Sequence, residues 1–132
     1  MSARVLVVDD IPANVRLLEA KLSAEYFDVM TADSGTAALD VIAANAPDIV
    51  LLDVMMPGMD GFEVCQRIKA NPRTLHIPVV MVTAQSAMKT VLECLKFGAI
   101  AYILKHSPKD EAAKMLRDAL DGLEAKSADE EV

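Results

Sequence analysis

The stretch DIVLLDVMMPGMDG, residues 48–61, places a short apolar run directly before a carboxylate. The run 49–52 contains only Ile, Val and Leu, and Asp53 follows it. This length and composition is typical of a strand buried on both faces of a parallel sheet. Asp60 adjoins Gly61, a pairing typical of a turn, and a helix is expected over 61–70. The stretch therefore predicts a strand that presents Asp53 at its carboxyl end, followed by a helix.

The rest of the chain repeats this alternation of short apolar runs and helical patterns. Five such strand–helix units, joined by right-handed crossovers, predict a doubly wound α/β domain. On the pattern alone, Rossmann and flavodoxin-like arrangements both stay open, although no GxGxxG or P-loop motif occurs. The other predicted strands are 5–8, 29–32, 79–82 and 100–104, and the other predicted helices are 14–24, 35–44, 87–97 and 110–125.

Length and charge limit the classes of function. The chain has 132 residues, and 13 basic against 20 acidic side chains give a net charge of −7. We expect one domain over 1–125, with 126–132 an acidic tail or the start of a linker. The negative charge disfavours direct nucleic-acid binding. No apolar stretch approaches the roughly 20 residues of a membrane span, so membrane insertion is not expected.

The two cysteines indicate a reducing compartment. Cys65 and Cys94 fall on different predicted helices and form no CxxC motif. We expect reduced thiols that pack as small hydrophobic groups. No signal-peptide pattern is visible at the amino terminus, which favours a cytoplasmic location.

Polar residues follow four of the predicted strands. Asp9 and Asp10 come after the first strand, Asp53 after the third, Thr83 after the fourth and Lys105 after the fifth. Ligands of open α/β sheets bind at the carboxyl ends of the strands. The order of elements therefore predicts that three carboxylates, a hydroxyl and an ammonium group meet at one edge.

That combination favours phosphoryl chemistry with a divalent cation. Two carboxylates about 4 Å apart repel by about 4 kcal/mol at an effective dielectric of about 20. Mg²⁺ would relieve this repulsion, because it prefers oxygen ligands and keeps open positions for phosphoryl oxygens. A carboxylate can act as the nucleophile and form an aspartyl-phosphate. Lys105 would then offset phosphoryl charge, and Thr83 would hydrogen-bond a phosphoryl oxygen.

Each of these residues also has an ordinary structural interpretation. Asp10 could cap the first helix, and Asp53 could cap a turn. Thr83 could be a strand-end threonine, and Lys105 a solvated lysine. The joint placement at four strand ends favours a site over these separate interpretations.

Three segments resemble the receiver domain of bacterial two-component response regulators. They are VLVVDD at 5–10, the 48–61 stretch and PVVMVTA at 78–84, and the resemblance extends over about 4–123. The first half, including DIPANVRLLEAKL at 10–22, is most similar to the N-terminal receiver of PleD-type regulators. The resemblance implies the flavodoxin-like (βα)5 arrangement, with strand order 2-1-3-4-5.

The resemblance also implies a role for each residue of the Mg²⁺ and phosphoacceptor site. Asp53 would be the phosphoacceptor. Asp9, Asp10, Asp53 and the backbone carbonyl of Met55 would hold Mg²⁺.

The same resemblance implies a switch next to this site. Lys105 would contact the phosphoryl group. Thr83 would be the switch hydroxyl, and Tyr102 would be the switch aromatic residue that moves inward with it.

These roles imply a signalling module and not a metabolic enzyme. Its chemistry would be limited to Mg²⁺-dependent autophosphorylation from a phosphodonor and autodephosphorylation. The phosphoryl donor would be a histidine kinase or a phosphotransfer protein, and the recipient of the signal a downstream output protein or domain. A homodimer is also expected.

Two other functions remain open. A receiver impaired in phosphorylation could serve as a constitutive binding or dimerisation module. A haloacid-dehalogenase-like phosphatase would need a second Asp two residues after the nucleophile, where this chain has Met55.

Two features depart from the family pattern. His106 follows Lys105 where the family has a proline, and Pro108 comes two residues later. Because a cis bond before a residue other than proline costs about 2.5–4 kcal/mol, we predict a trans Lys105–His106 bond and a rearranged loop. The segment 98–102, where the predicted fifth strand begins, is more apolar than is usual in the family. Ile100 could contact a partner there or lie in the strand core, and we predict the core position.

Overall fold

The computed structural model describes residues 3–83, 88–104 and 118, and within these ranges strands and helices alternate. The described strands and helices begin and end within two residues of the predicted limits. The helix predicted over 110–125 lies outside the described residues, except that position 118 is helical. The elements are β1 (Arg4–Val8), α1 (Pro12–Ala24), β2 (Asp28–Ala32), α2 (Gly35–Ala44), β3 (Ile49–Asp53), α3 (Gly61–Ala70), β4 (Val79–Thr83), α4 (Met88–Lys96) and β5 (Ala101–Leu104).

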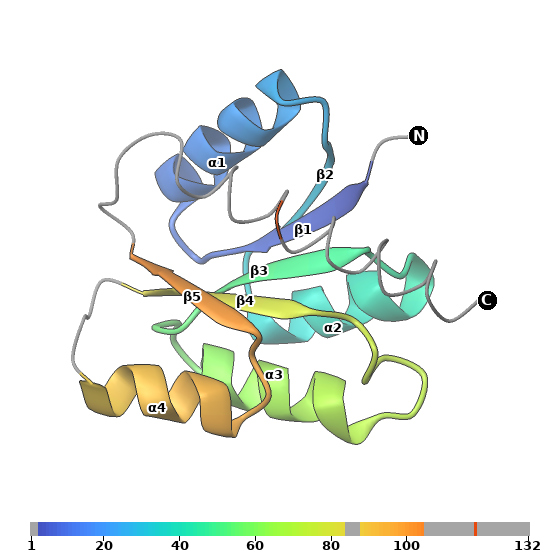
Figure 1. Cartoon of the computed structure of the whole chain (residues 1–132). Helices are drawn as coiled ribbons and strands as arrows, with labels where there is room; N and C mark the ends of the chain where they lie inside the picture. Colours follow the sequence, from blue (N-terminus) through green and yellow to red (C-terminus); the bar gives the residue numbers. More distant parts are fainter. Residues whose placement is uncertain (1–2, 84–87, 105–117, 119–132) are drawn as a thin grey trace.

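The sheet is parallel, with the order β2-β1-β3-β4-β5, which confirms the flavodoxin-like arrangement. The chain first moves outward from β1 to β2 and then returns to place β3 on the other side of β1. The direction of winding therefore reverses between β1 and β3 (Figure 1). Ligands bind at such a reversal in open α/β sheets. The ends of β1 and β3 are accordingly where a site is expected.

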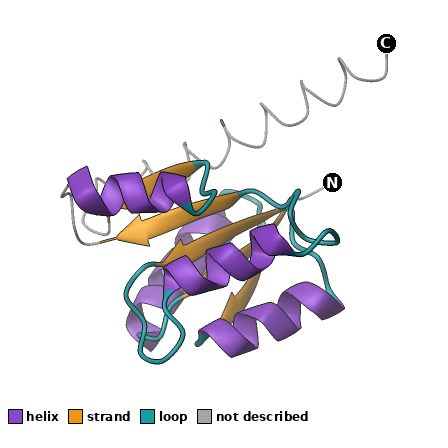
Figure 2. Ribbon diagram, turned by 90° about the horizontal axis from the view of Figure 1, so that it is seen from below, coloured by secondary structure: helices purple, strands orange, loops and turns teal. Residues whose placement is uncertain are grey.

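Helices cover both faces of the sheet (Figure 2). Because successive strand residues point to opposite faces, Leu6 and Leu52 pack on the face covered by α2, α3 and α4. Val7 and Leu51 pack on the opposite face, which also holds Leu22 of α1. The apolar side chains of the central strands thus contribute to two separate layers of the core.

The central strands and the edge strand β2 differ in burial. All of β3 and β4, and β1 apart from Arg4, are buried, as predicted. The prediction of burial on both faces is wrong for β2, where Val29 and Met30 are half-buried and Thr31 is exposed. An edge strand has a neighbour on only one side, and the helices beside it leave part of each face open to solvent.

Two helix ends carry the residue types that favour helix termini. Pro12 is the first residue of α1, where its missing N–H costs no hydrogen bond. Gly98 follows α4 with φ +97°, and its N–H donates to Leu95 O at 3.1 Å. The Ala99 N–H donates to Cys94 O at 3.1 Å, which completes a Schellman ending.

Both cysteines are buried free thiols, as predicted, one on α3 and one on α4. The Cys65 thiol donates to Phe97 O at 3.2 Å, and burial raises its pKa to about 11. Burial also raises the pKa of Cys94. Because the thiolate is the reactive form, these cysteines are packing residues. Among the described helices, none is long and apolar enough to cross a membrane.

Candidate functional site

Three carboxylates meet where β1 and β3 end. Asp9 follows β1, Asp53 is the last residue of β3, and one carboxylate oxygen from each of Asp9, Asp10 and Asp53 lies within 4.8 Å of the others. Asp9 and Asp53 are 2% and 1% exposed, and Asp10 is half-buried. The strands β1 and β3 are parallel neighbours, so their carboxyl ends lie at the same level. The structure therefore brings together the three carboxylates that the sequence singled out.

Asp9 is held by hydrogen bonds to the backbone and to α1. Its N–H donates to Ala32 O at 3.2 Å. Its Oδ1 accepts from the Ile11 N–H at 2.9 Å, and its Oδ2 accepts from Asn14 Nδ2 at 3.3 Å. The N-cap residue of α1 is Ile11, which makes no side-chain capping bond, so the alternative of Asp10 as the helix cap is wrong.

Sequence reasoning did not assign a function to Asn14. The available signal was a carboxamide three residues into a helix that lacks a side-chain cap, five residues after a candidate metal ligand. A side chain placed there can reach back to the strand end.

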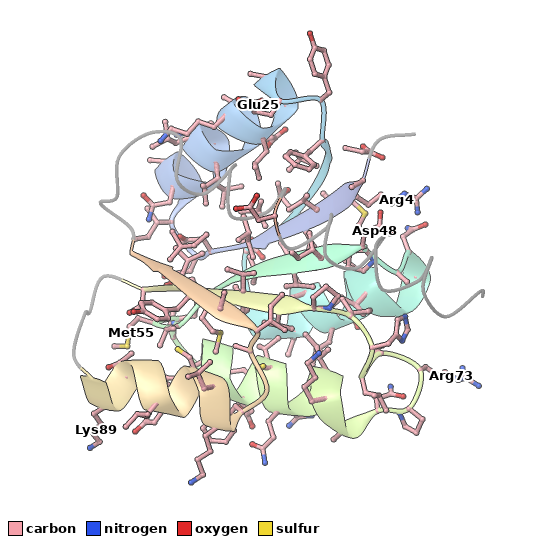
Figure 3. All side chains as sticks on the ribbon, in the orientation of Figure 1. Arg4, Glu25, Asp48, Met55, Arg73 and Lys89 are labelled. Carbon is pink, nitrogen blue, oxygen red and sulfur yellow. The ribbon has the colours of Figure 1, made fainter. Side chains whose placement is uncertain are left out.

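The sequence left open whether Asp53 caps a turn or belongs to a carboxylate site, and in the structure it does both. Its Oδ1 accepts from the Met55 N–H at 3.2 Å, the pattern of an Asx turn. Its carboxylate also lies beside those of Asp9 and Asp10. The Met55 side chain is exposed at the sheet edge where β3 and β4 end (Figure 3).

The start of α3 packs directly on the backbone of Asp53. A Cβ at Gly61 would overlap the carbonyl oxygen of Asp53 and lie 2.9 Å from Val54 Cα. The Gly61 N–H donates to Val54 O at 3.0 Å, and the Asp60 side chain caps the helix by accepting from the Glu63 N–H at 2.9 Å. Asp60 is thus the N-cap of α3, whereas the sequence suggested only a turn, and the close approach of Gly61 was not predicted.

The remaining predicted residues are placed only in part. Thr83 ends β4 and is buried, one residue beyond the register partner of Asp53. Tyr102 lies in β5 and is 37% exposed. Lys105 and His106 lie outside the described residues, so the trans bond and the role of Lys105 stay predictions.

The predicted core position of Ile100 is wrong. Its side chain is 50% exposed, although its N–H donates to Val79 O at 2.9 Å. Ile100 directly precedes the edge strand β5, so the backbone joins the sheet without enclosing the side chain.

The donor set fits a hard divalent cation. The carboxylates of Asp9, Asp10 and Asp53 supply only oxygen atoms, and two of these residues are almost fully buried. Buried like charges at this separation repel unless a cation or a proton compensates them. Mg²⁺ is bound by few protein carboxylates and keeps several waters, which matches a three-carboxylate site.

Comparison with known proteins identifies the class. The sequence model of the response regulator receiver domain matches residues 5–117, and the chain belongs to this family. Receiver domains are signalling modules that interact with histidine kinases and output domains, and they generally bind Mg²⁺ at an acidic cluster.

Several individual proteins are similar to the chain. It is 58% identical over 105 residues to the response regulator PleD of Caulobacter vibrioides, which covers 80% of this chain and 23% of PleD. It is 38% identical over 116 residues to the DNA-binding response regulator MtrA of Mycolicibacterium smegmatis, which covers 87% of this chain and 50% of MtrA. A putative response regulator from Chloroflexus aurantiacus has a solved structure with a TM-score of 0.88 and 31% identity, covering 92% of this chain and 99% of the other.

The matches to PleD and MtrA limit which of their properties can be assigned to this chain. The chain spans half or less of the length of PleD and of MtrA. One relative carries the name of a DNA-binding regulator, so the expectation that this protein has no nucleic-acid partner gains no support.

Proposed function

We propose that Asp53 accepts a phosphoryl group from a histidine kinase or a phosphotransfer protein. The observation that carries the proposal is the cluster of Asp9, Asp10 and Asp53 at the reversal point of a receiver-family sheet. A buried strand-end carboxylate close to two others is suited to phosphoryl transfer, because a cation held there offsets the charge of both the nucleophile and the incoming group.

The transfer is an in-line displacement at phosphorus. An oxygen of Asp53 forms a bond to phosphorus, the phosphorus–nitrogen bond of the phosphohistidine breaks, and the imidazole leaves with its electron pair and takes up a proton. Asp9, Asp10, Asp53 and the backbone carbonyl of Met55 would hold the Mg²⁺. When bound, the ion supplies positive charge for the phosphoryl oxygens. The Lys105 ammonium adds a second positive charge.

Phosphorylation would act on the rest of the domain through Thr83 and Tyr102. Thr83 ends the strand next to β3 and would hydrogen-bond the new phosphoryl oxygens, after which Tyr102 would move inward. Exposed apolar side chains at Leu92, Leu95 and Ile100 lie on α4 and just before β5. They supply a surface for an output partner or a second copy. In this proposal the receiver occupies 1–125, and 126–132 is a tail or the start of a linker.

The alternative is a receiver that binds its partner constitutively. It is favoured by His106 in the position where the family has proline, because a displaced Lys105 would weaken phosphorylation. The exposed apolar side chains would then be a permanent contact surface.

Intact-protein mass spectrometry tests the proposal. The full chain is incubated with acetyl phosphate, with Mg²⁺ or with EDTA, alongside Asp53→Ala. The matched control is Asp40→Asn, because Asp40 is an exposed carboxylate on α2. We expect one added phosphoryl group in the wild type and in Asp40→Asn with Mg²⁺, and none in Asp53→Ala or with EDTA. A wild type that gains no phosphoryl group and also fails to bind beryllofluoride would overturn the proposal in favour of constitutive binding.

A further inference from the structure

Helix α1 begins without a capping side chain of its own. Its N-cap residue, Ile11, has no side-chain acceptor, and Pro12 has no N–H. The Asn14 and Val15 N–H groups both donate to Ile11 O, at 3.0 and 3.2 Å. The carboxamide of Asn14, the third residue of the helix, turns back to the end of β1.

The first turn of α1 supplies a donor to each carboxylate oxygen of Asp9. The Ile11 N–H reaches Oδ1 at 2.9 Å, and Asn14 Nδ2 reaches Oδ2 at 3.3 Å. Hydrogen bonds to both oxygen atoms restrain the plane of the carboxylate. A carboxylate oxygen has two lone pairs, so an oxygen that accepts a hydrogen bond can also coordinate a cation. The orientation of Asp9 is thus determined before any ion binds.

The donor at position 14 is neutral, which matters beside a cation site. A lysine there would neutralise Asp9 and repel a divalent ion, whereas a carboxamide orients the carboxylate and leaves its charge intact. The amide must present its nitrogen, because an ionised carboxylate only accepts hydrogen bonds. Partners of this kind commonly set metal affinity, and their loss costs about 10–100-fold.

We infer that Asn14 is a positioning residue for Asp9 and sets the affinity of the site for Mg²⁺. This inference rests on the proposed function, because it requires Asp9 to be a ligand of the ion. In this inference Asn14 acts through Asp9 and is not itself a ligand of the ion.

A Mg²⁺ titration of the unphosphorylated full chain, followed by NMR, tests the inference. The readouts are the backbone amide signals of Ile11 and Met55, which donate to Asp9 and Asp53. The variants are Asn14→Leu, which keeps the size of the side chain, and Asn14→Ala. Asn45→Leu makes the same chemical change at an exposed position at the end of α2. We expect the Kd for Mg²⁺ to rise about tenfold in both Asn14 variants and to stay within about twofold of the wild type in Asn45→Leu.

The melting temperature without Mg²⁺ separates positioning from a purely structural role. A structural role would lower the melting temperature of both Asn14 variants and leave the Kd of the folded protein unchanged, and this result would overturn the inference. An equal rise of Kd in Asn45→Leu would overturn it as well. A wild type whose amide signals do not respond to Mg²⁺ would overturn the proposed Mg²⁺ site together with the inference. A loss of Mg²⁺ affinity that is confined to the Asn14 variants supports both the Mg²⁺ site and the inference.

Discussion

Two helices begin beside the site, and their sequences specify them to different extents. Helix α3 follows Asp53, starts at its own cap Asp60, and buries four residues along one face, namely Gly61, Val64, Cys65 and Ile68. Helix α1 follows Asp9 and Asp10, starts at the uncapped Ile11, and buries Leu22 alone among its residues.

The backbone conformation at the carboxyl end also differs between the two helices. Helix α1 ends at Ala24 and is followed, after its C-cap Glu25, by Tyr26, which has φ +67° and is 84% exposed. Its N–H donates to Ser23 O, and the Phe27 N–H donates to Leu22 O. This is the Schellman ending that normally uses glycine, as at Gly98. Helix α3 ends at Asn71 in an extended conformation that any residue adopts.

The contrast shows how each helix is connected to the cluster of Asp9, Asp10 and Asp53. Helix α3 forms from its own cap and buried face, so it acts as a fixed support under Asp53. At the start of α1 the Ile11 N–H and the Asn14 side chain donate to the Asp9 carboxylate, so the start of this helix and the site depend on each other. Three substitutions test this contrast, from the largest expected effect to the smallest.

Gly61→Ala should damage the support under Asp53. The added Cβ would overlap the Asp53 carbonyl oxygen, a backbone atom that cannot move without shifting β3. We expect a loss of about 3 kcal/mol in the free energy of unfolding, measured by urea denaturation, together with loss of phosphorylation. Gly58→Ala is the control, because Gly58 has φ +75° and nothing within 4 Å of an added Cβ, and backbone strain alone should cost about 1 kcal/mol. Equal losses in the two variants would show that α3 does not press on Asp53.

Asp60→Ala should weaken α3 and leave the cation site intact. It removes the acceptor for the Glu63 N–H, and we expect a loss of about 1 kcal/mol in the free energy of unfolding. The Kd for Mg²⁺ should stay within about twofold of the wild type, because no hydrogen bond joins Asp60 to the three carboxylates in the described structure. The matched variant is Ile11→Ala, which alters an N-cap that makes no side-chain bond and should cost less than half as much. A larger loss from Ile11→Ala would reverse the contrast between the helices.

Tyr26→Gly should stabilise the end of α1. A left-handed backbone costs an ordinary residue roughly 1 kcal/mol, and the exposed ring of Tyr26 has little packing to lose. Part of this gain is offset by the greater freedom of glycine in the unfolded chain, so we expect an increase of about 0.5 kcal/mol in the free energy of unfolding. Tyr26→Ala keeps the strain and should show no increase. A decrease in Tyr26→Gly would mean that the tyrosine ring makes a stabilising contact.

Much of the fold could be predicted from local patterns. The apolar run before Asp53 and its four counterparts each form a strand. The same patterns failed for the exposure of β2 and of Ile100. Apolar composition shows that a segment can be buried, whereas its place at the centre or the edge of a sheet depends on strand order.

For the candidate site too, some features could be predicted from the sequence and others were found only in the structure. The placement of Asp9, Asp10 and Asp53 after their strands was enough to predict that they lie together. The contact of Asn14 with Asp9 and the approach of Gly61 to the Asp53 carbonyl were not predicted. Both depend on the angle at which a helix leaves the sheet, which is set by packing across the core.

The sequence by itself determined the alternation of strands and helices, the strand-end carboxylates and the chemistry that they permit, because these depend on residue type and spacing along the chain. Only the tertiary structure decided that the start of α1 orients Asp9 and that the start of α3 supports Asp53. Those contacts are made through space, between side chains and backbone atoms that adjoining elements bring to one edge of the sheet.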